Sequence, residues 1–316
     1  MSPGSDAMYS LRSAHREVLD MGRNNFDGSA GNASIAIPRM RRSARGLATA
    51  DAIVKIRCLG NFSLRQSPNS VPTPLKGNSR PAALLLLLIA AGPQGIEKID
   101  AELKLWPHAQ NALADSTLDT TLYRLRKLLG SQRAIEVSNG IVRLDERYVS
   151  VDAWIFASEA DALKACVQSS ANTGEFEQIT IRCDRIFDLY KGPFLAQDLK
   201  TPWVMQMRDS LQSKFFRAIK LTGAYWQATQ HWDRAALLYE RALELDNLAE
   251  EIHRELMRCY LARRESADAV RVFRRCRELL SVVMGVTPSE ATETLYRQAL
   301  AEPSQPQISL KSVSLG

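Results

Sequence analysis

The chain has 316 residues, of which 45% are hydrophobic and 24% are charged, enough for two or three cores of ordinary size. No apolar run reaches the roughly 18–20 residues that a membrane span needs. The N-terminal sequence MSPGSDAMYSLRS lacks the apolar segment of a secretory signal. Five cysteines are scattered without a C-x-x-C pair, which favours buried free thiols in a reducing compartment. We therefore expect a cytoplasmic protein without a membrane segment.

The net charge of +6 is unevenly distributed along the chain. Residues 52–150 carry thirteen Lys and Arg against eight Asp and Glu, a net charge of +5, whereas residues 151–316 carry a net charge of −1. Residues 1–51 contribute +2. The excess of cations lies in the first half, where we expect an anionic partner. The excess is small, however, and many soluble domains carry as much.

The two ends of the chain have the composition of linkers. Residues 1–51 lack a sustained apolar period, and their stretch DGSAGNASIAIPRMRRSARG is rich in Gly, Ser, Ala and Arg. This composition predicts a disordered linker or extension, within which RMRR is a minor candidate for phosphate contact. Residues 303–316 are expected to form a flexible tail.

Residues 52–150 carry the elements of a small α+β domain. The stretch VKIRCLGNFSLRQ alternates apolar and polar residues with period two, which predicts one half-buried strand. The stretch SRPAALLLLLIAAG then predicts a helix with Ser79 as its N-cap, Pro81 in its first turn and Gly92 after its end. A second helix is expected at about 97–105, where a Trp-Pro pair follows.

A third helix is expected from about residue 110 to Leu129, and its last part reads STLDTTLYRLRKLL. The following AIEVSNGIVRLD predicts two short strands joined at Asn139-Gly140, a strong hairpin signal. Strand, three helices and hairpin in this order predict a winged helix-turn-helix domain.

Everything beyond Asp152 has helical periodicity, with helices expected at about 153–170, 175–190, 203–229, 231–245, 248–262, 265–283 and 289–300. Ala235, Tyr239, Ala242 and Leu245 recur 34 residues later as Ala269, Phe273, Cys276 and Leu279. This small–large–small pattern is typical of tetratricopeptide (TPR) helix pairs, and chance amphipathicity is the alternative. The expected fold is mainly α with a small α+β part: a winged helix-turn-helix domain at 52–150 followed by a TPR-like helical domain at 151–302.

The third helix has two different faces. Its four leucines, Leu118, Leu122, Leu125 and Leu129, share one side at about 100° per residue. The other side holds Ser116, Thr120, Tyr123, Arg124 and Lys127, with Asp119 and Arg126 on the flanks. Arginine forks suit guanine or phosphate, and hydroxyls suit phosphates and base edges, so this mixture favours a DNA recognition helix. The alternatives are a solvated surface or cations that complement the helix dipole.

The hairpin and the start of the first helix offer further candidate contacts. Ser138, Asn139 and Arg143 lie on or beside the turn, from which they could reach the minor groove or its phosphates. The alternative is a hairpin that only closes the sheet, which every winged helix needs. Lys76 and Arg80, near the start of the first helix, are candidate phosphate clamps.

The region from about 54 to 302 resembles the SARP-type regulators, in which an OmpR-like winged helix precedes a bacterial transcriptional activator domain (BTAD). The matching stretches are LGNFSL, LWPHAQNALADSTLDTTLYRLRKLLG, VDAWIFASEADAL, LYKGPFL, PWVMQMRDSL, HWDRAALLYERALELDNLAEEIHRELMRCYLARRESADAVRVFRRCRELL and GVTPSEATETLYRQAL. The last two are quite specific. The resemblance implies a TPR-like domain packed against the DNA-binding domain. It also implies activation of transcription through repeated promoter sites and RNA polymerase.

The resemblance also implies individual roles on the third helix. Base contacts fall at Asp119, Thr120, Tyr123 and Arg124, and phosphate contacts fall at Ser116, Thr117, Thr121 and Arg126. OmpR-type helices often have Arg or His at some of these positions, where this chain has Tyr123 and Thr121, so the target sequence does not carry over. Larger family members add an ATPase module, but the chain has no G-x-x-x-x-G-K-[ST] loop, so nucleotide hydrolysis is not expected.

Other chemistry has little support. The four histidines, at positions 15, 108, 231 and 253, lack metal-ligand spacing, and no G-x-S-x-G or Cys/His signature is present. We expect no enzymatic activity, metal or cofactor. The sequence predicts a transcriptional activator whose partners are double-stranded DNA and RNA polymerase, with a homodimer left open. The alternative is a helical-repeat scaffold whose winged helix binds protein.

Overall fold

The computed structural model describes residues 54–66, 79–106, 111–169, 175–196 and 202–301. The predicted linker, Lys76 and the predicted tail lie outside these residues, and so does the side chain of Ser116. The described residues form two compact units. The first contains the described residues up to Ala165 together with 176–215, and the second contains 216–301 together with 166–169 and 175. The predicted boundary at residue 151 follows the sequence pattern instead, and it stays a prediction.

A small sheet begins the first unit. Strand β1 (Val54–Arg57) pairs antiparallel with β2 (Ser63–Arg65) and parallel with β6 (Val149–Val151). The sequence predicted one strand where β1 and β2 lie, and this is wrong because the chain reverses at Gly60. The φ of Gly60 is 91°, which lies in the left-handed region that glycine tolerates. The period-two pattern itself is confirmed, since β1 buries its apolar residues and exposes its cations.

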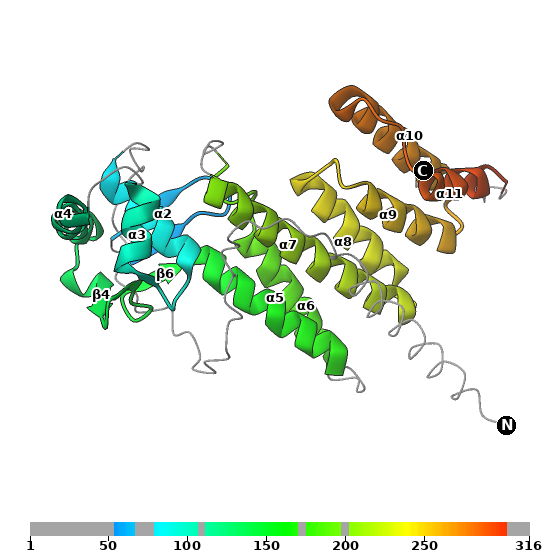
Figure 1. Cartoon of the computed structure of the whole chain (residues 1–316). Coiled ribbons are helices and arrows are strands. Elements are labelled where there is room, and N and C mark those ends of the chain that lie inside the picture. The colour runs from blue at the N-terminus through cyan, green and yellow to red at the C-terminus, as the bar shows by residue number, and fades with distance from the viewer. Residues whose placement is uncertain (1–53, 67–78, 107–110, 170–174, 197–201, 302–316) are drawn as a thin grey trace, which may run out of the picture. The chain divides into compact units, whose positions relative to one another are not determined.

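Three helices follow, as predicted. Helix α2 (Arg80–Ala91) begins at Ser79, whose hydroxyl accepts a hydrogen bond from a first-turn amide, and ends at a glycine cap. Helix α3 (Lys98–Leu105) and helix α4 (Asn111–Leu129) come next in the chain. Helix α4 packs against both α2 and α3, and the three are grouped at the left of Figure 1.

The second sheet carries the wing. Its order is β3 (Ile96–Glu97), β5 (Ile141–Leu144) and β4 (Ile135–Ser138), with antiparallel neighbours. Asn139 and Gly140 have φ values of 51° and 76°, the two left-handed residues of a tight hairpin, as predicted. Strands β3 and β6 were not predicted, because two or three residues are too short to show a period. The first unit thus contains a winged helix-turn-helix.

Buried polar contacts fix this winged helix to the start of α5 (Asp152–Ser169). The carboxylate of Asp152 accepts hydrogen bonds from the amide of Cys58 at 2.9 Å and from the amide of Leu59 at 3.1 Å. The Cys58 thiol also donates to Asp152, at 2.8 Å. The indole of Trp154 donates to the carbonyl of Ile89 at the end of α2, at 2.8 Å. The start of α5 is therefore part of the folded body that carries α4.

An aromatic cluster holds the rest of the first unit together. It lies between α5, α6 (Glu175–Leu189) and the first half of α7 (Pro202–Ala228). The ring of Tyr190 stacks on Phe215 with 4.3 Å between centroids and lies 5.2 Å from Phe156. All five cysteines are free, and all but Cys166 are buried, in line with the expected free thiols.

The second unit is made of paired helices. After the end of α7 come α8 (Trp232–Leu245), α9 (Glu250–Ala262), α10 (Ser266–Leu279), the π-turn η3 (Leu280–Met284) and α11 (Glu290–Ala301). The 34-residue repeat is confirmed, because Ala235 and Ala269 are both fully buried and Tyr239 and Phe273 are 1% and 3% exposed.

The turns of the two pairs repeat with the same spacing. Gln230 and Arg264, 34 residues apart, have φ values of 65° and 61°. The next amide, at His231 or Glu265, bonds in each case to the carbonyl five residues earlier, at 2.7 and 2.8 Å. Backbone geometry and packing therefore agree on a TPR-like pair of helix hairpins.

Gly223 of α7 has no side chain and so leaves room for the ring of Tyr239 in this core. A Cβ at residue 223 would lie 2.0 Å from the Tyr239 hydroxyl oxygen. Burial raises the pKa of that hydroxyl well above its ordinary value. We expect Gly223→Ala to lower the free energy of unfolding by about 1–3 kcal/mol, as overpacking does. Urea unfolding followed by circular dichroism measures this. An unchanged unfolding midpoint would contradict the packing described.

Glu250 of α9 holds the start of α11. Its Oε1 accepts hydrogen bonds from the Ser289 amide at 2.7 Å and from the hydroxyls of Ser289 and Thr292, both at 2.6 Å. Partial burial raises the pKa of Glu250, but these hydrogen bonds and the charge of Arg254 outweigh it, so the net pKa is lowered. A lowered pKa in the folded state adds stability above the ordinary value of about 4.3. That stability is lost as the pH falls through the lowered pKa.

We therefore expect Glu250→Gln to reduce thermal stability at pH 7, because the amide is a weaker acceptor than the carboxylate. The difference from wild type should shrink as the pH falls below about 4. Calorimetry of both proteins at several pH values measures the difference, with Glu290→Gln on the exposed start of α11 as the matched control. A gap that stays constant with pH would show that the Glu250 charge does not matter.

Candidate nucleic-acid interface

Helix α4 is held by its leucines, as the sequence predicted. Leu118, Leu122, Leu125 and Leu129 are between 0% and 2% exposed. The apolar stripe packs against α2, whose own run of leucines is buried. Each buried leucine contributes about 1.5–3 kcal/mol through the apolar surface removed from water. The opposite face of α4 is thereby fixed in an outward orientation.

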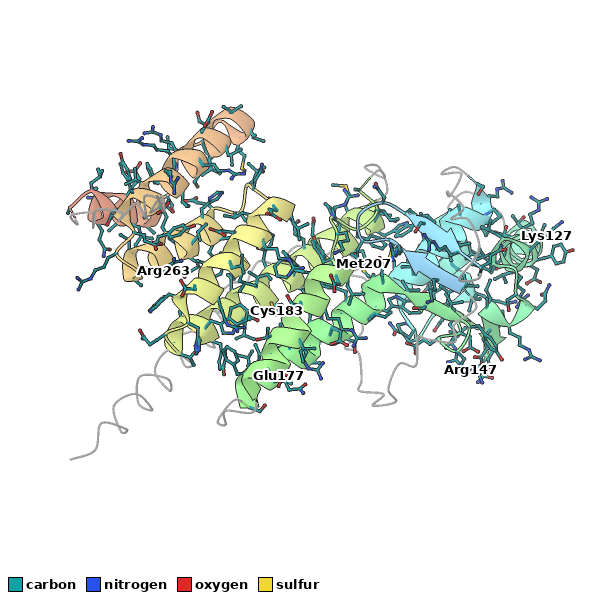
Figure 2. The ribbon with its side chains drawn as sticks, turned by 180° about the vertical axis from the view of Figure 1, so that it is seen from behind. Lys127, Arg147, Glu177, Cys183, Met207 and Arg263 are labelled. Carbon is teal, nitrogen blue, oxygen red and sulfur yellow. The ribbon has the colours of Figure 1, made fainter. Side chains whose placement is uncertain are left out.

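That outward face carries cations near the C-terminal end of α4. Arg124 and Lys127 are exposed, and neither has an acidic partner among the residues that the structure describes. The ring of Tyr123 is 61% exposed beside them. Figure 2 shows Lys127 extending from α4 into solvent. Thr120 is also exposed on this face.

The N-terminal part of the same face has an ion pair. The ammonium group of Lys98, the first residue of α3, lies 3.4 Å from the carboxylate of Asp119. The Asp119 side chain is 64% exposed, so the pair is solvated and weak. A carboxylate here can still accept a hydrogen bond from a cytosine amino group. Lys98 was not singled out from the sequence, because only the helix packing brings it to Asp119.

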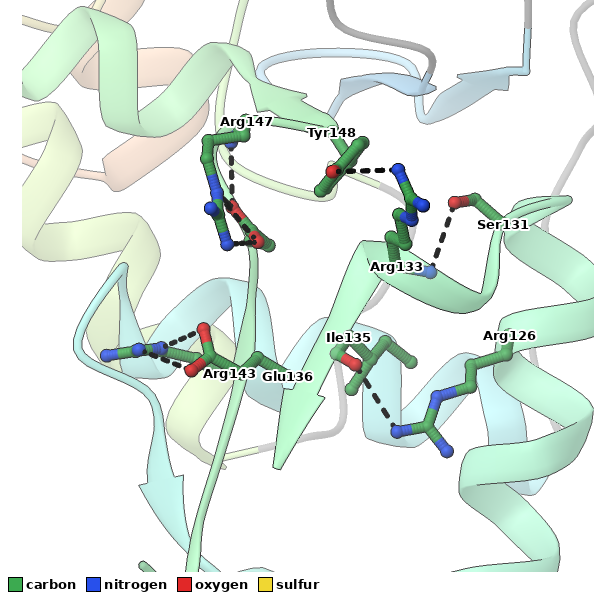
Figure 3. Close-up of polar contacts among 9 residues, drawn as sticks. Arg126, Ser131, Arg133, Ile135, Glu136, Arg143, Arg147 and Tyr148 are labelled. Atoms are coloured by element: carbon green, nitrogen blue, oxygen red, sulfur yellow. Dashed lines mark hydrogen bonds and ion pairs between the residues drawn. The ribbon is translucent and has the colours of Figure 1, made fainter. Parts of the chain in front are cut away.

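Two predicted phosphate contacts are directed into the protein instead. Thr121 is 3% exposed and its hydroxyl donates to the carbonyl of Thr117 at 2.7 Å, so this hydroxyl is unavailable to a phosphate. Arg126 is half-buried and donates to the carbonyl of Ile135 on β4, at 3.3 Å (Figure 3). Its guanidinium group joins α4 to the wing. Thr117 itself is half-buried.

The wing arginine is neutralised within the sheet. Arg143 on β5 faces Glu136 on β4, its register partner, and the two side chains form a bidentate ion pair at 2.8 and 3.0 Å. Figure 3 shows this pair across the hairpin. Ser138 and Asn139 are exposed at the tip. Arg80, at the start of α2, is exposed and lies 5.9 Å from the Trp106 ring.

Sequence reasoning missed two arginines at the base of the wing. Arg133, just before β4, is exposed and lies 6.0 Å from the Tyr148 ring, with a hydrogen bond of 3.5 Å to its hydroxyl (Figure 3). Arg147 lies 5.8 Å from the same ring, but Asp145 accepts its hydrogen bond at 2.6 Å. That hydrogen bond lowers the pKa of Asp145 from its ordinary value. No motif in the sequence could have revealed this group, since only the fold assembles it.

The described residues contain no group of three or more His, Cys, Asp and Glu side chains arranged to hold a metal ion. His253 is 1% exposed, and its ring nitrogen bonds to the carbonyl of Asn247 at 2.9 Å. Among the described helices, none is both long and apolar enough to cross a membrane.

Comparison with known proteins identifies the helical part. Residues 151–300 match the bacterial transcriptional activator domain, from the position where the sequence predicted this domain to begin. Among solved structures, the chain is similar to EmbR of Mycobacterium tuberculosis, solved in complex with a low-affinity phosphopeptide. The two share 18% identity with a TM-score of 0.56, over 78% of this chain and 65% of EmbR. At this identity the likeness concerns the fold alone. No curated protein matches the sequence.

Proposed function

We propose that the chain is a SARP-type transcriptional regulator and that it activates transcription by binding duplex DNA through α4. The observation that carries this proposal is the outward face of α4. There, leucine packing presents Arg124 and Lys127 to solvent without acidic partners among the described residues. A helix so exposed and so charged fits the major groove, where cations displace counterions and arginine reads guanine.

The structure narrows the proposed contacts. We assign base contacts to Asp119, Thr120, Tyr123 and Arg124. Phosphate contacts are assigned to Lys127, Arg80 and, near the N-terminal end of α4, Ser116, and Ser138 and Asn139 are assigned to the wing contact. Thr121 and Arg126 are left out, because one is buried and the other is bonded to the wing. Thr117, which is half-buried, stays a predicted phosphate contact.

The helical domain supplies the second half of the proposed function. TPR-like repeats bury one face of each helix against its neighbours and leave the other faces for partners. We propose that this domain contacts RNA polymerase or a second copy of the chain while the winged helix holds the promoter. The proposed place of action is the cytoplasm, where bacterial DNA lies.

Binding to duplex DNA at increasing salt tests the proposal. We expect the affinity to fall steeply, with a log–log slope of about −0.9 for each phosphate neutralised. Fluorescence anisotropy with a labelled promoter fragment measures both affinity and slope. Affinity without salt dependence, or no duplex binding at all, would favour the alternative of a scaffold whose winged helix binds protein.

The wing offers a matched pair of substitutions. Arg143 is held by Glu136, whereas Arg133 at the wing base has a tyrosine but no acidic partner among the described residues. We expect Arg133→Ala to weaken duplex binding and to make the salt slope shallower by about one unit, as loss of one phosphate contact does. Arg143→Ala should change the slope less, because its charge is already compensated. The reverse order in the same anisotropy assay would place the phosphate contact at the wing strand instead.

A further inference from the structure

Arginines are concentrated in one part of the second unit. Residues 216–301 contain twelve Arg and a single Lys, and eight of these Arg lie between positions 254 and 277, with only three acidic residues among them. Four belong to α10, namely Arg271, Arg274, Arg275 and Arg277, and all four are exposed. Guanidinium groups bind carboxylates and phosphates through paired hydrogen bonds, which lysine cannot do.

Three of these arginines share a face with exposed apolar residues. Helix α10 continues into η3 without a break, because its last residue and the following Leu280 both keep helical dihedrals. Arg271, Arg274, Arg275, Glu278 and Val282 follow the helical spacing that places side chains on one side, so this side carries three arginines and one exposed carboxylate. The opposite side, with Ala269, Phe273, Cys276 and Leu280, is buried. Its neighbours are α9 and α11 (Figure 1).

The apolar end of this face is unusually open. Val282, Val283 and Met284 are 79%, 59% and 56% exposed, and Val286 after the turn is 47% exposed. Single exposed apolar residues are common, but four within five positions form a patch of the kind found at interaction sites. A π-turn is itself uncommon and is found mostly at functional sites. We name the arginine-bearing side of α10, together with the exposed apolar residues that follow it at 282–286, the α10–η3 face.

Two of the arginines at the N-terminal end of the α10–η3 face are available to bind a partner's carboxylates. Arg271 pairs with Asp268, and Arg277 lies 5.8 Å from the ring of Phe273. Arg274 and Arg275 have no acidic partner within the described part of the chain. The 34-residue repeat keeps an arginine at one of these positions, since Arg241 of α8 corresponds to Arg275, whereas Glu240 corresponds to Arg274. Arg274 is therefore the cation that belongs to α10 alone.

We propose that the α10–η3 face docks an acidic segment of a partner protein in which carboxylates alternate with apolar side chains. Arg274 and Arg275 bind the carboxylates, while Val282, Val283 and Met284 receive the apolar groups. A nucleic-acid backbone would satisfy the arginines but would leave the valines in water. Arginine and methionine are also the residues that protein interfaces favour. This surface is independent of α4, so the inference goes beyond DNA binding.

A synthetic peptide tests this directly. The probe is a labelled helical peptide of repeated Glu-Glu-Leu-Leu, titrated with the full chain and followed by anisotropy. We expect binding that Arg274→Glu/Arg275→Glu weakens by at least about tenfold, as truncating close charge pairs does. Val282→Ser/Val283→Ser should weaken it as well. A peptide with Lys in place of Glu should bind the Arg274→Glu/Arg275→Glu variant better than it binds wild type.

Two matched controls come from the same unit. Arg217 is an exposed arginine of α7 without an acidic partner among the described residues, and Leu237 on α8 is 65% exposed. Arg217→Glu and Leu237→Ser should leave peptide binding unchanged. Equal loss in these controls, or no loss in the Arg274→Glu/Arg275→Glu variant, overturns the proposal. Direct binding of labelled duplex DNA that persists in Arg124→Ala/Lys127→Ala but is lost in Arg274→Glu/Arg275→Glu would assign the face to nucleic acid and overturn the proposal too.

Discussion

Replacing both Arg124 and Lys127 by alanine is expected to weaken binding to duplex DNA by about 100-fold or more. A well-placed arginine–base contact is worth about 1–3 kcal/mol, and a lost phosphate contact adds to this at low salt. The salt slope should also become shallower by about one to two units, because fewer counterions are released. The helix itself should remain, since both side chains lie on the face opposite the buried leucines.

The control for this variant removes the same charge from another part of the winged helix. Lys55 and Arg57 are exposed on β1, and their double alanine variant also lowers the net charge by two. If binding depends only on general electrostatic attraction, both variants should lose the same affinity for duplex DNA. If α4 contacts the bases, only the α4 variant should show the large loss. Anisotropy titrations at two salt concentrations distinguish the outcomes. Equal affinities of the α4 variant and wild type would remove α4 from the interface.

Asp152→Ala is expected to lower the free energy of unfolding by about 2–5 kcal/mol. The substitution leaves the amides of Cys58 and Leu59 without their acceptor, and each buried amide left unpaired costs about 1–3 kcal/mol. Burial raises the pKa of Asp152 although hydrogen bonds from Cys58 and Leu59 lower it, so the site holds its proton more readily than a surface carboxyl does. Asp152→Asn, which keeps one acceptor oxygen, should therefore cost less.

The consequence for function follows from the position of Asp152. It joins the β1–β2 turn to the start of α5, within the same unit as α4. We expect Asp152→Ala to reduce the fraction of protein competent to bind DNA at physiological temperature, without changing the salt slope of the folded fraction. Urea unfolding and anisotropy on the same samples measure both. Wild-type stability in Asp152→Ala would mean that the buried hydrogen bonds at this junction contribute nothing.

The sequence was a good guide wherever a periodic pattern sets the structure. The four leucines of α4, the Asn139-Gly140 turn and the 34-residue repeat each follow from spacing alone, and each is confirmed. The single strand predicted near Gly60 was wrong, because a period of two does not reveal where a chain reverses. Strand β3 has only two residues and was missed for lack of any period.

The candidate interface was harder to predict from the sequence, because the exposure and the ion-pair partners of a side chain depend on residues distant along the chain. The sequence predicted Arg143 as a cation of the wing that could contact DNA. In the structure, the β4–β5 register places Glu136 beside it, and the two side chains form an ion pair. The family resemblance implied a phosphate contact at Thr121, but its side chain is buried next to the leucines of α4. Lys98 meets Asp119 only because α3 packs against α4. Helical spacing gives the direction of a side chain, but partners come from the tertiary fold.

The two proposals assign DNA binding to one unit and protein binding to the other. The outward face of α4 in the first unit would bind the promoter, and the α10–η3 face of the second unit would bind an acidic segment of a partner protein. The proposed function needs both surfaces, because occupancy of DNA alone does not recruit transcription machinery. Substitutions at one face should leave binding at the other unchanged, since α4 and α10 belong to different compact units.

Selection of bound duplexes from a random oligonucleotide pool tests the central claim most directly. The full chain should enrich one sequence motif, and Arg124→Ala should relax the preference at one base position of that motif while the other positions persist. Enrichment of no motif, or the same motif with unchanged preference in Arg124→Ala, would contradict sequence-specific reading of DNA by α4.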